Sequence, residues 1–159
     1  SLAEVTSRDK VLDPFCGVGT IAIEAALMGA TAAGMDISEK AIKMSQKNAK
    51  RAAVKVKFMH KDSLETKLRA ESVDKIVTNM PFGKQTKIER ERTFFNKFLR
   101  ESARILRPNG KVVVLTAHYT ILRDVIKETR RFSIVQVRSI SLYGLTPTIL
   151  ILKKATRKA

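Results

Sequence analysis

The sequence lacks several features that define particular classes of protein. A single cysteine among 159 residues excludes an internal disulfide, and with two histidines it leaves too few ligands for a metal cluster. No apolar run approaches the roughly 20 residues of a membrane-spanning helix, and the N-terminal residues SLAEVTSRDK do not resemble a signal peptide. We therefore expect one globular domain over residues 1–159, in the cytoplasm, with no metal and no membrane contact.

Acidic residues are also scarce. Lysine and arginine number 31 against 15 acids, which gives a formal net charge of +16. An excess of this size favours a polyanionic partner such as a nucleic acid. The alternative is a solvated lysine-rich surface of the kind found in thermophile proteins. A basic membrane-surface domain is disfavoured, because no segment has the pattern of a strongly amphipathic basic helix.

Strand and helix patterns alternate along almost the whole chain. The last two predicted strands have no helix between them, so they must pair antiparallel. This order predicts an α/β fold: a doubly wound, Rossmann-like, mostly parallel seven-stranded sheet with an antiparallel C-terminal hairpin. The expected strands are 10–13, 31–36, 54–59, 73–78, 111–116, 133–142 and 148–153, and the expected helices are 20–28, 38–52, about 93–106 and about 120–129. We also expect a basic loop at 83–92 and a Pro-Asn-Gly turn at 108–110. His60 and His118 are expected to be ordinary surface or packing residues.

A glycine-containing turn, DPFCGVGT at 13–20, lies between the first strand and the first helix. Gly17 and Gly19 allow the main chain to approach a ligand closely, and their spacing also fits the G-x-G-x-x-A dinucleotide fingerprint. Asp13 separates these interpretations, because its carboxylate would repel a pyrophosphate but attract the amino group and sulfonium of S-adenosylmethionine. Asp36, at the end of the second strand, can accept hydrogen bonds from the ribose diol of either cofactor.

A second motif, NMPFG at 79–83, follows the fourth strand. It resembles the Asn/Asp-Pro-Pro-Tyr/Phe signature of amino-methyltransferases, with Met80 in place of the first proline. Together with DPFCGVGTIAIEAA at 13–26, it makes the chain resemble the methyltransferase domain of the THUMP-type RNA guanine-N2 methyltransferases. The resemblance implies a Rossmann-like fold, S-adenosylmethionine as the donor, and a guanine of tRNA or rRNA as the acceptor.

The chemistry of an exocyclic amine explains why such residue types are needed. The Asn79 side-chain oxygen and the backbone carbonyl near Pro81 can accept both amine hydrogens, which steers the nitrogen lone pair toward the methyl group. Phe82 offers a flat face for an extruded base. A plain turn is the alternative for this motif, since asparagine, proline and glycine all form turns and Phe82 would then be core.

The expected site residues fall into two groups. Asp62 and Ser63 have two open interpretations, because they can hold the adenine amino group or simply cap a helix. Cys16 is expected to be a small buried residue and not a nucleophile. The catalytic group is Asn79, Pro81 and Phe82; the donor-binding group is Asp13, Pro14, Phe15, Cys16, Gly17, Gly19, Thr20, Asp36, Ile37, Asp62, Ser63 and Asn79.

Other functions remain possible at this point. The acceptor can instead be adenine N6 of RNA or DNA, or a protein amide nitrogen, although the charge of +16 disfavours the protein acceptor. An RNA-binding module with a vestigial cofactor site and a nicotinamide oxidoreductase are two further alternatives. Because folds of this class usually carry more chain before their first strand, we expect a fragment that lacks an N-terminal RNA-binding domain.

Overall fold

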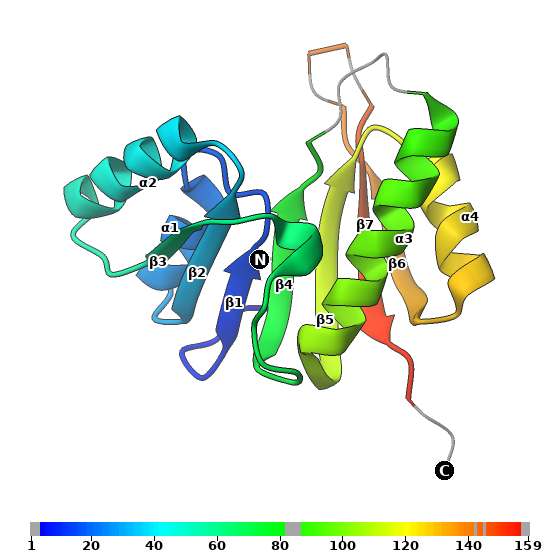
Figure 1. The fold of residues 1–159 in the computed structure, drawn as a ribbon, viewed down its shortest axis with the longest axis horizontal. Coiled ribbons are helices and arrows are strands. Elements are labelled where there is room, and N and C mark those ends of the chain that lie inside the picture. The colour runs from blue at the N-terminus through cyan, green and yellow to red at the C-terminus, as the bar shows by residue number, and fades with distance from the viewer. Residues whose placement is uncertain (1–3, 82–86, 142, 145, 157–159) are drawn as a thin grey trace.

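The computed structural model describes residues 4–81, 87–141, 143–144 and 146–156. Its sheet has the strand order β3-β2-β1-β4-β5-β7-β6 (Figure 1). β7 runs antiparallel to both of its neighbours, β5 and β6, and the other six strands of this sheet point in one direction. The predicted fold is therefore confirmed. The strands are β1 (Lys10–Asp13), β2 (Thr31–Asp36), β3 (Lys57–His60), β4 (Val73–Asn79), β5 (Leu106–Thr116), β6 (Phe132–Ser139) and β7 (Thr148–Lys154); the helices are α1 (Thr20–Leu27), α2 (Glu39–Arg51), the short 3-10 helix η1 (Ser63–Glu65), α3 (Ile88–Ile105) and α4 (Tyr119–Thr129).

Two hydrophobic cores form because successive strand residues face opposite sides of the sheet. Leu12 belongs to the larger core, which contains the buried side chains of α3 and α4. Its neighbour Val11 belongs to the smaller core, which contains Ala22 and Ala25 of α1. Small alanine side chains let α1 approach the sheet closely, and this brings the turn that precedes α1 against the ends of β1 and β2.

Four predicted boundaries are wrong by three residues or more, and one of them is the end of β6, which lies at Ser139 instead of position 142. The third strand starts at Lys57 instead of Val54, and α3 starts at Ile88, about one turn before the expected residue. β5 already begins at Leu106, because the pairing with β4 jumps from Val73↔Leu106 to Lys75↔Lys111. The expected Pro-Asn-Gly turn is therefore a bulge inside a strand, with Asn109 at a φ of 65°.

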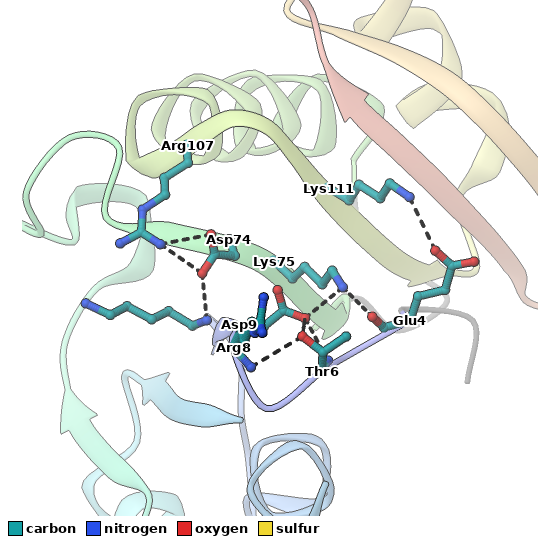
Figure 2. Close-up of polar contacts among 9 residues, drawn as sticks. Glu4, Thr6, Arg8, Asp9, Asp74, Lys75, Arg107 and Lys111 are labelled. Carbon is teal, nitrogen blue, oxygen red and sulfur yellow. Dashed lines mark hydrogen bonds and ion pairs between the residues drawn. The ribbon is translucent and has the colours of Figure 1, made fainter. Parts of the chain in front are cut away.

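A polar network attaches the N-terminal segment to the starts of β4 and β5 (Figure 2). Lys75 Nζ lies 2.8 Å from Asp9 Oδ2, and both side chains are about 15% exposed. Asp74 accepts hydrogen bonds from Arg107 Nη1 at 2.9 and 3.0 Å and from the backbone N of Lys10 at 2.8 Å. These contacts fix the position of β1, and therefore also the position of Asp13 at its carboxyl end.

Two features are absent from the part of the chain that the structure describes. None of the helices there is both long enough and apolar enough to cross a membrane. The same residues contain no group of three or more histidine, cysteine, aspartate or glutamate side chains arranged to hold a metal ion.

Candidate active site

The carboxyl ends of β1 and β4 meet at a groove of about 960 Å³. Because these parallel strands are neighbours, the turn after β1 and the motif after β4 open on the same space. The structure thus brings the two sequence motifs together in one groove. Its lining includes Asp13, Phe15, Cys16, Gly17, Thr20, Asn79 and Pro81, which were predicted, and Thr78, which was not.

Asp13 lies at the wall of this groove and is only 2% exposed. Its Oδ1 accepts hydrogen bonds from Thr78 Oγ1 at 2.7 Å and from the backbone N of Phe15 at 3.0 Å. Burial raises the pKa of Asp13 to about 6, against the opposing effect of these two hydrogen bonds. A buried carboxylate with no cation beside it is costly, so a positively charged ligand group would be favoured here.

Thr78 is a residue of the groove that the sequence did not reveal. It is buried, it precedes Asn79 directly, and its hydroxyl links the end of β4 to the end of β1 through Asp13. A threonine near the end of a strand is ordinary by composition. Only the parallel pairing of β1 with β4 gives this hydroxyl its partner.

The side chain of Asp36 accepts backbone hydrogen bonds that stabilise the turn. Its Oδ2 accepts a hydrogen bond from the backbone N of Gly17 at 2.9 Å, and its Oδ1 accepts one from the backbone N of Ser38 at 2.8 Å. Gly17 has a φ of +52°. The carboxylate therefore supports the turn directly, and its expected contact with a ribose diol would use the remaining lone pairs.

The two glycines of the turn have different reasons to be glycine. A Cβ on Gly17 would meet no heavy atom within 4 Å, so this residue faces open space. A Cβ on Gly19, which has a φ of +92°, would lie 2.9 Å from both Phe58 Cζ and Ser45 Cβ. Gly19 thus lets α1 pack against α2 and β3, whereas Gly17 leaves room beside the groove.

This difference predicts unequal effects of alanine at the two positions. Gly19→Ala combines left-handed strain with overpacking and should destabilise the fold by about 2–4 kcal/mol. Gly17→Ala carries the strain alone and should cost about 1 kcal/mol. Chemical denaturation of the two variants beside the parent chain measures both values. Equal losses would mean that the contacts of Gly19 with Phe58 and Ser45 do not matter.

The remaining donor-side residues support the turn or lie beside it. Pro14 is buried, and its carbonyl accepts a hydrogen bond from the buried Ser63 hydroxyl. Asp62 Oδ1 accepts one from the backbone N of Leu64 at 2.9 Å, which makes Asp62 the N-cap of η1. The capping interpretation of Asp62 is therefore confirmed, and its contact with an adenine stays a prediction. Ile37, 74% exposed, offers an apolar surface next to Asp36.

The side chains of Phe15 and Cys16 pack against other parts of the protein. The Phe15 ring lies 5.4 Å from that of Phe94 and 5.8 Å from that of Phe98, both on α3. Cys16 is buried, and burial is the main cause that raises the pKa of its thiol to about 12. A thiol with that pKa stays protonated at neutral pH, in agreement with the expectation that Cys16 is not a nucleophile.

The second motif presents Asn79 at the rim of the groove. Asn79 is exposed, and its side chain makes no hydrogen bond to any residue that the structure describes. Met80 is 7% exposed in the larger core, and its backbone N donates to the carbonyl of Leu115 at 2.9 Å. The apolar residue in place of the first proline therefore anchors the motif to β5. Pro81 is exposed and lines the groove, while Phe82 lies outside the described residues.

The last part of the basic loop predicted at 83–92 is helical instead, because α3 already begins at Ile88. Glu91 lies in the first turn of α3 and is only 1% exposed. Its Oε2 lies 3.2 Å from Nδ1 of His118, which precedes α4. This buried contact and the Met80–Leu115 hydrogen bond hold the chain on either side of 82–86 close to the end of β5. His118, expected to be an ordinary surface or packing residue, thus has a specific acidic partner.

Comparison with known proteins agrees with this geometry. A model of the family described as "RMKL-like, methyltransferase domain" matches residues 1–147. The chain is 32% identical over 158 residues to the tRNA (guanine(10)-N2)-dimethyltransferase of Methanothermobacter thermautotrophicus, which covers 97% of this chain and 46% of that protein. It is 35% identical over 119 residues to the U6 snRNA (guanine-N(2))-methyltransferase THUMPD2 of Bos taurus, with 72% and 23% covered.

A solved structure supports the same assignment of the fold. The crystal structure of TrmN from Thermus thermophilus matches with a TM-score of 0.87 and 28% identity, over 97% of this chain and 46% of that one. The chain thus spans less than half the length of these relatives.

Proposed function

The chain belongs to the RMKL-like methyltransferase domain family, and from this premise we propose that it transfers a methyl group from S-adenosylmethionine to the exocyclic N2 amine of a guanine in RNA. The observation that carries the proposal is the shared groove, in which the buried carboxylate of Asp13 and the exposed amide of Asn79 both lie. The relatives named as tRNA and U6 snRNA guanine-N2 methyltransferases support RNA guanine as the acceptor.

The residues of the groove fit the proposed donor. Asp13 supplies a buried negative charge for the donor's ammonium group, and the open space at Gly17 allows close approach of the main chain. Asp36 and the exposed Ile37 lie at the end of β2, where we expect the ribose and the adenine ring. The donor supplies an electrophilic methyl group on its sulfonium.

The motif after β4 orients the acceptor. The Asn79 side-chain oxygen and the backbone carbonyl of Pro81 accept the two amine hydrogens, so that the nitrogen lone pair points toward the donor side. Anchoring of Met80 to Leu115 fixes these acceptors relative to Asp13 before any substrate arrives. Catalysis on this scheme consists of positioning and electrostatics, and it needs no covalent intermediate with the protein.

Methyl transfer to an unmodified tRNA transcript tests the proposal. With radiolabelled S-adenosylmethionine, we expect label in the RNA and N2-methylguanosine after digestion to nucleosides. Detection of N6-methyladenosine instead would show that the acceptor is adenine and not guanine. Calorimetric titration with S-adenosylmethionine and with NAD gives a second readout, because NAD binding without S-adenosylmethionine binding would contradict the donor assignment.

We also propose that this chain acts as the catalytic domain of a longer cytoplasmic protein that has a separate RNA-binding domain. The support is the coverage of 46% of the M. thermautotrophicus relative beside 97% of this chain. Addition in trans of the half of that relative that lies outside the match should raise the rate on tRNA. An unchanged rate over a range of concentrations of that half would count against a separate RNA-binding domain.

A further inference from the structure

Helix α3 carries a row of cations on its solvent side. Arg90, Lys97 and Arg104 are exposed and follow one another at intervals of seven residues, so they lie on one face of the helix with a spacing of about 10 Å. Arg100 is exposed and adjoins this face. The buried side chains of α3, such as Phe95 and Leu99, occupy the opposite face. The solvent side of α3 is therefore a basic track about 21 Å long from Arg90 to Arg104.

The acids on α3 neutralise only part of this track. Glu91 is buried against His118, and Glu101 binds Arg104 Nη2 at 2.7 Å on the flank of the helix. Arg92 lies off the track and is paired with Glu128 of α4. Arg90, Lys97 and Arg100 make no ion pair with any described residue, although Glu89 lies beside Arg90 in a shallow hollow at the start of the helix.

The track ends in a second hollow of about 810 Å³, at the end of α3 far from Asn79. This hollow is lined by Arg100, Arg130 and Arg131. Arg130 has a left-handed backbone conformation and ends α4. Among its described lining residues, Glu71 is the one acid. In all, the basic residues that line it are Arg100, Arg104, Arg130, Arg131 and Lys154.

We propose that the basic track of α3 and the hollow at its end bind the phosphate backbone of the RNA whose guanine enters the groove. The inference rests on the proposed function for the identity of the polyanion. α3 starts shortly after the Asn79 motif, so its track leads away from the groove along the outside of the protein (Figure 1). Guanidinium groups bind phosphate oxygens through paired N–H donors, which suits the arginines of the hollow. A substrate as long as a tRNA can contact both ends of the track.

The salt dependence of RNA binding tests this surface. The variant Arg100→Gln/Arg131→Gln removes two cations from the hollow, and both residues are exposed and lack ion pairs with the described residues. Its matched control, Lys47→Gln/Arg51→Gln, removes two exposed cations from α2, which lies on the other side of the sheet's centre (Figure 1). The probe is an unmodified tRNA transcript, with Kd measured between 50 and 300 mM salt.

We expect the hollow variant to bind this tRNA about tenfold more weakly, with the slope of log Kd against log salt lowered by about 1.4–1.8. The control should differ from the parent by less than twofold, and both variants should keep the parent's Kd for S-adenosylmethionine. Equal weakening in both variants, or none in the hollow variant, overturns the inference. A parent chain that binds tRNA with the expected difference but transfers no methyl group contradicts the proposed function and leaves the RNA surface supported.

Discussion

Replacement of Asn79 by alanine should lower kcat for methyl transfer by about 100- to 1000-fold, the usual cost of losing one group that stabilises a transition state. The amide oxygen is expected to accept a hydrogen bond that strengthens as the amine nitrogen gains positive charge, and alanine cannot supply it. Asn79 is exposed and its side chain makes no hydrogen bond to a described residue, so the fold should lose little stability. Steady-state rates on a tRNA transcript, with donor binding measured by calorimetry, check both expectations.

Asn79→Asp is the matched control for this experiment. It keeps an acceptor oxygen at nearly the same position and should retain more activity than the alanine variant. The Kd for S-adenosylmethionine should change less than twofold in Asn79→Ala. A variant that loses donor binding together with activity would place Asn79 on the donor side of the groove and remove it from the role of base acceptor.

The succession of strands and helices along the chain, and the location of both motifs within it, could be predicted because they depend on local patterns. The apolar segments 10–13, 73–78 and 111–116 identify the central strands, and short connections force the last two strands to pair antiparallel. The first and last residues of an element were harder to predict where a tertiary contact determines them. The pairing of Val73 with Leu106 extends β5 past a Pro-Asn-Gly sequence that by itself predicts a turn.

The start of α3 shows why charge patterns mislead. Residues 89–92 read as a solvated loop, since glutamate and arginine alternate there without apolar periodicity. In the structure Glu91 is buried because His118, 27 positions later in the chain, supplies its partner. A sequence shows the two residues but not the approach of α3 to the end of β5.

The site was predictable as a set of residues but not as a set of interactions. The resemblance to guanine-N2 methyltransferases is confirmed by the family model and by the relatives. Yet nothing in the sequence singles out Thr78. The sequence also predicts one shared role for Gly17 and Gly19, whereas the structure shows two. Phe82, the predicted stacking residue, lies outside the described residues and stays a prediction.

Asp13→Asn should weaken donor binding while it stabilises the fold. Both hydrogen bonds to Asp13, from Thr78 and from the backbone N of Phe15, reach Oδ1, so an asparagine oxygen can accept both. Only the charge is lost. The donor's ammonium group then has no anionic partner, and Kd for S-adenosylmethionine should rise about 10- to 100-fold, as for a hydrogen bond between charged groups. Calorimetry at pH 7.5 measures this change.

The pKa of Asp13 determines whether Asp13→Asn is more or less stable than the parent chain. Burial raises this pKa from 3.8 to about 6, so between these values the folded protein binds more protons than the unfolded chain. The free energy of unfolding contributed by Asp13 therefore falls as the pH rises from about 4 to about 6, and stays low above that. Asparagine cannot ionise, so Asp13→Asn should be about 2–3 kcal/mol more stable than the parent at pH 7.5 and nearly equal to it near pH 4. Urea denaturation at both pH values checks the difference.

The same pKa controls how the parent chain binds its donor. Below about pH 6 the Asp13 carboxyl is protonated, so affinity for S-adenosylmethionine should fall as the pH falls through this value. Thr78→Val removes a hydrogen bond that lowers the pKa of Asp13, and it should move the midpoint of this pH dependence upward. Asp13→Asn should have no such dependence. If its donor affinity still changed with pH in this range, another group would set the charge of the groove, and Asp13 would not be the anion that holds the donor.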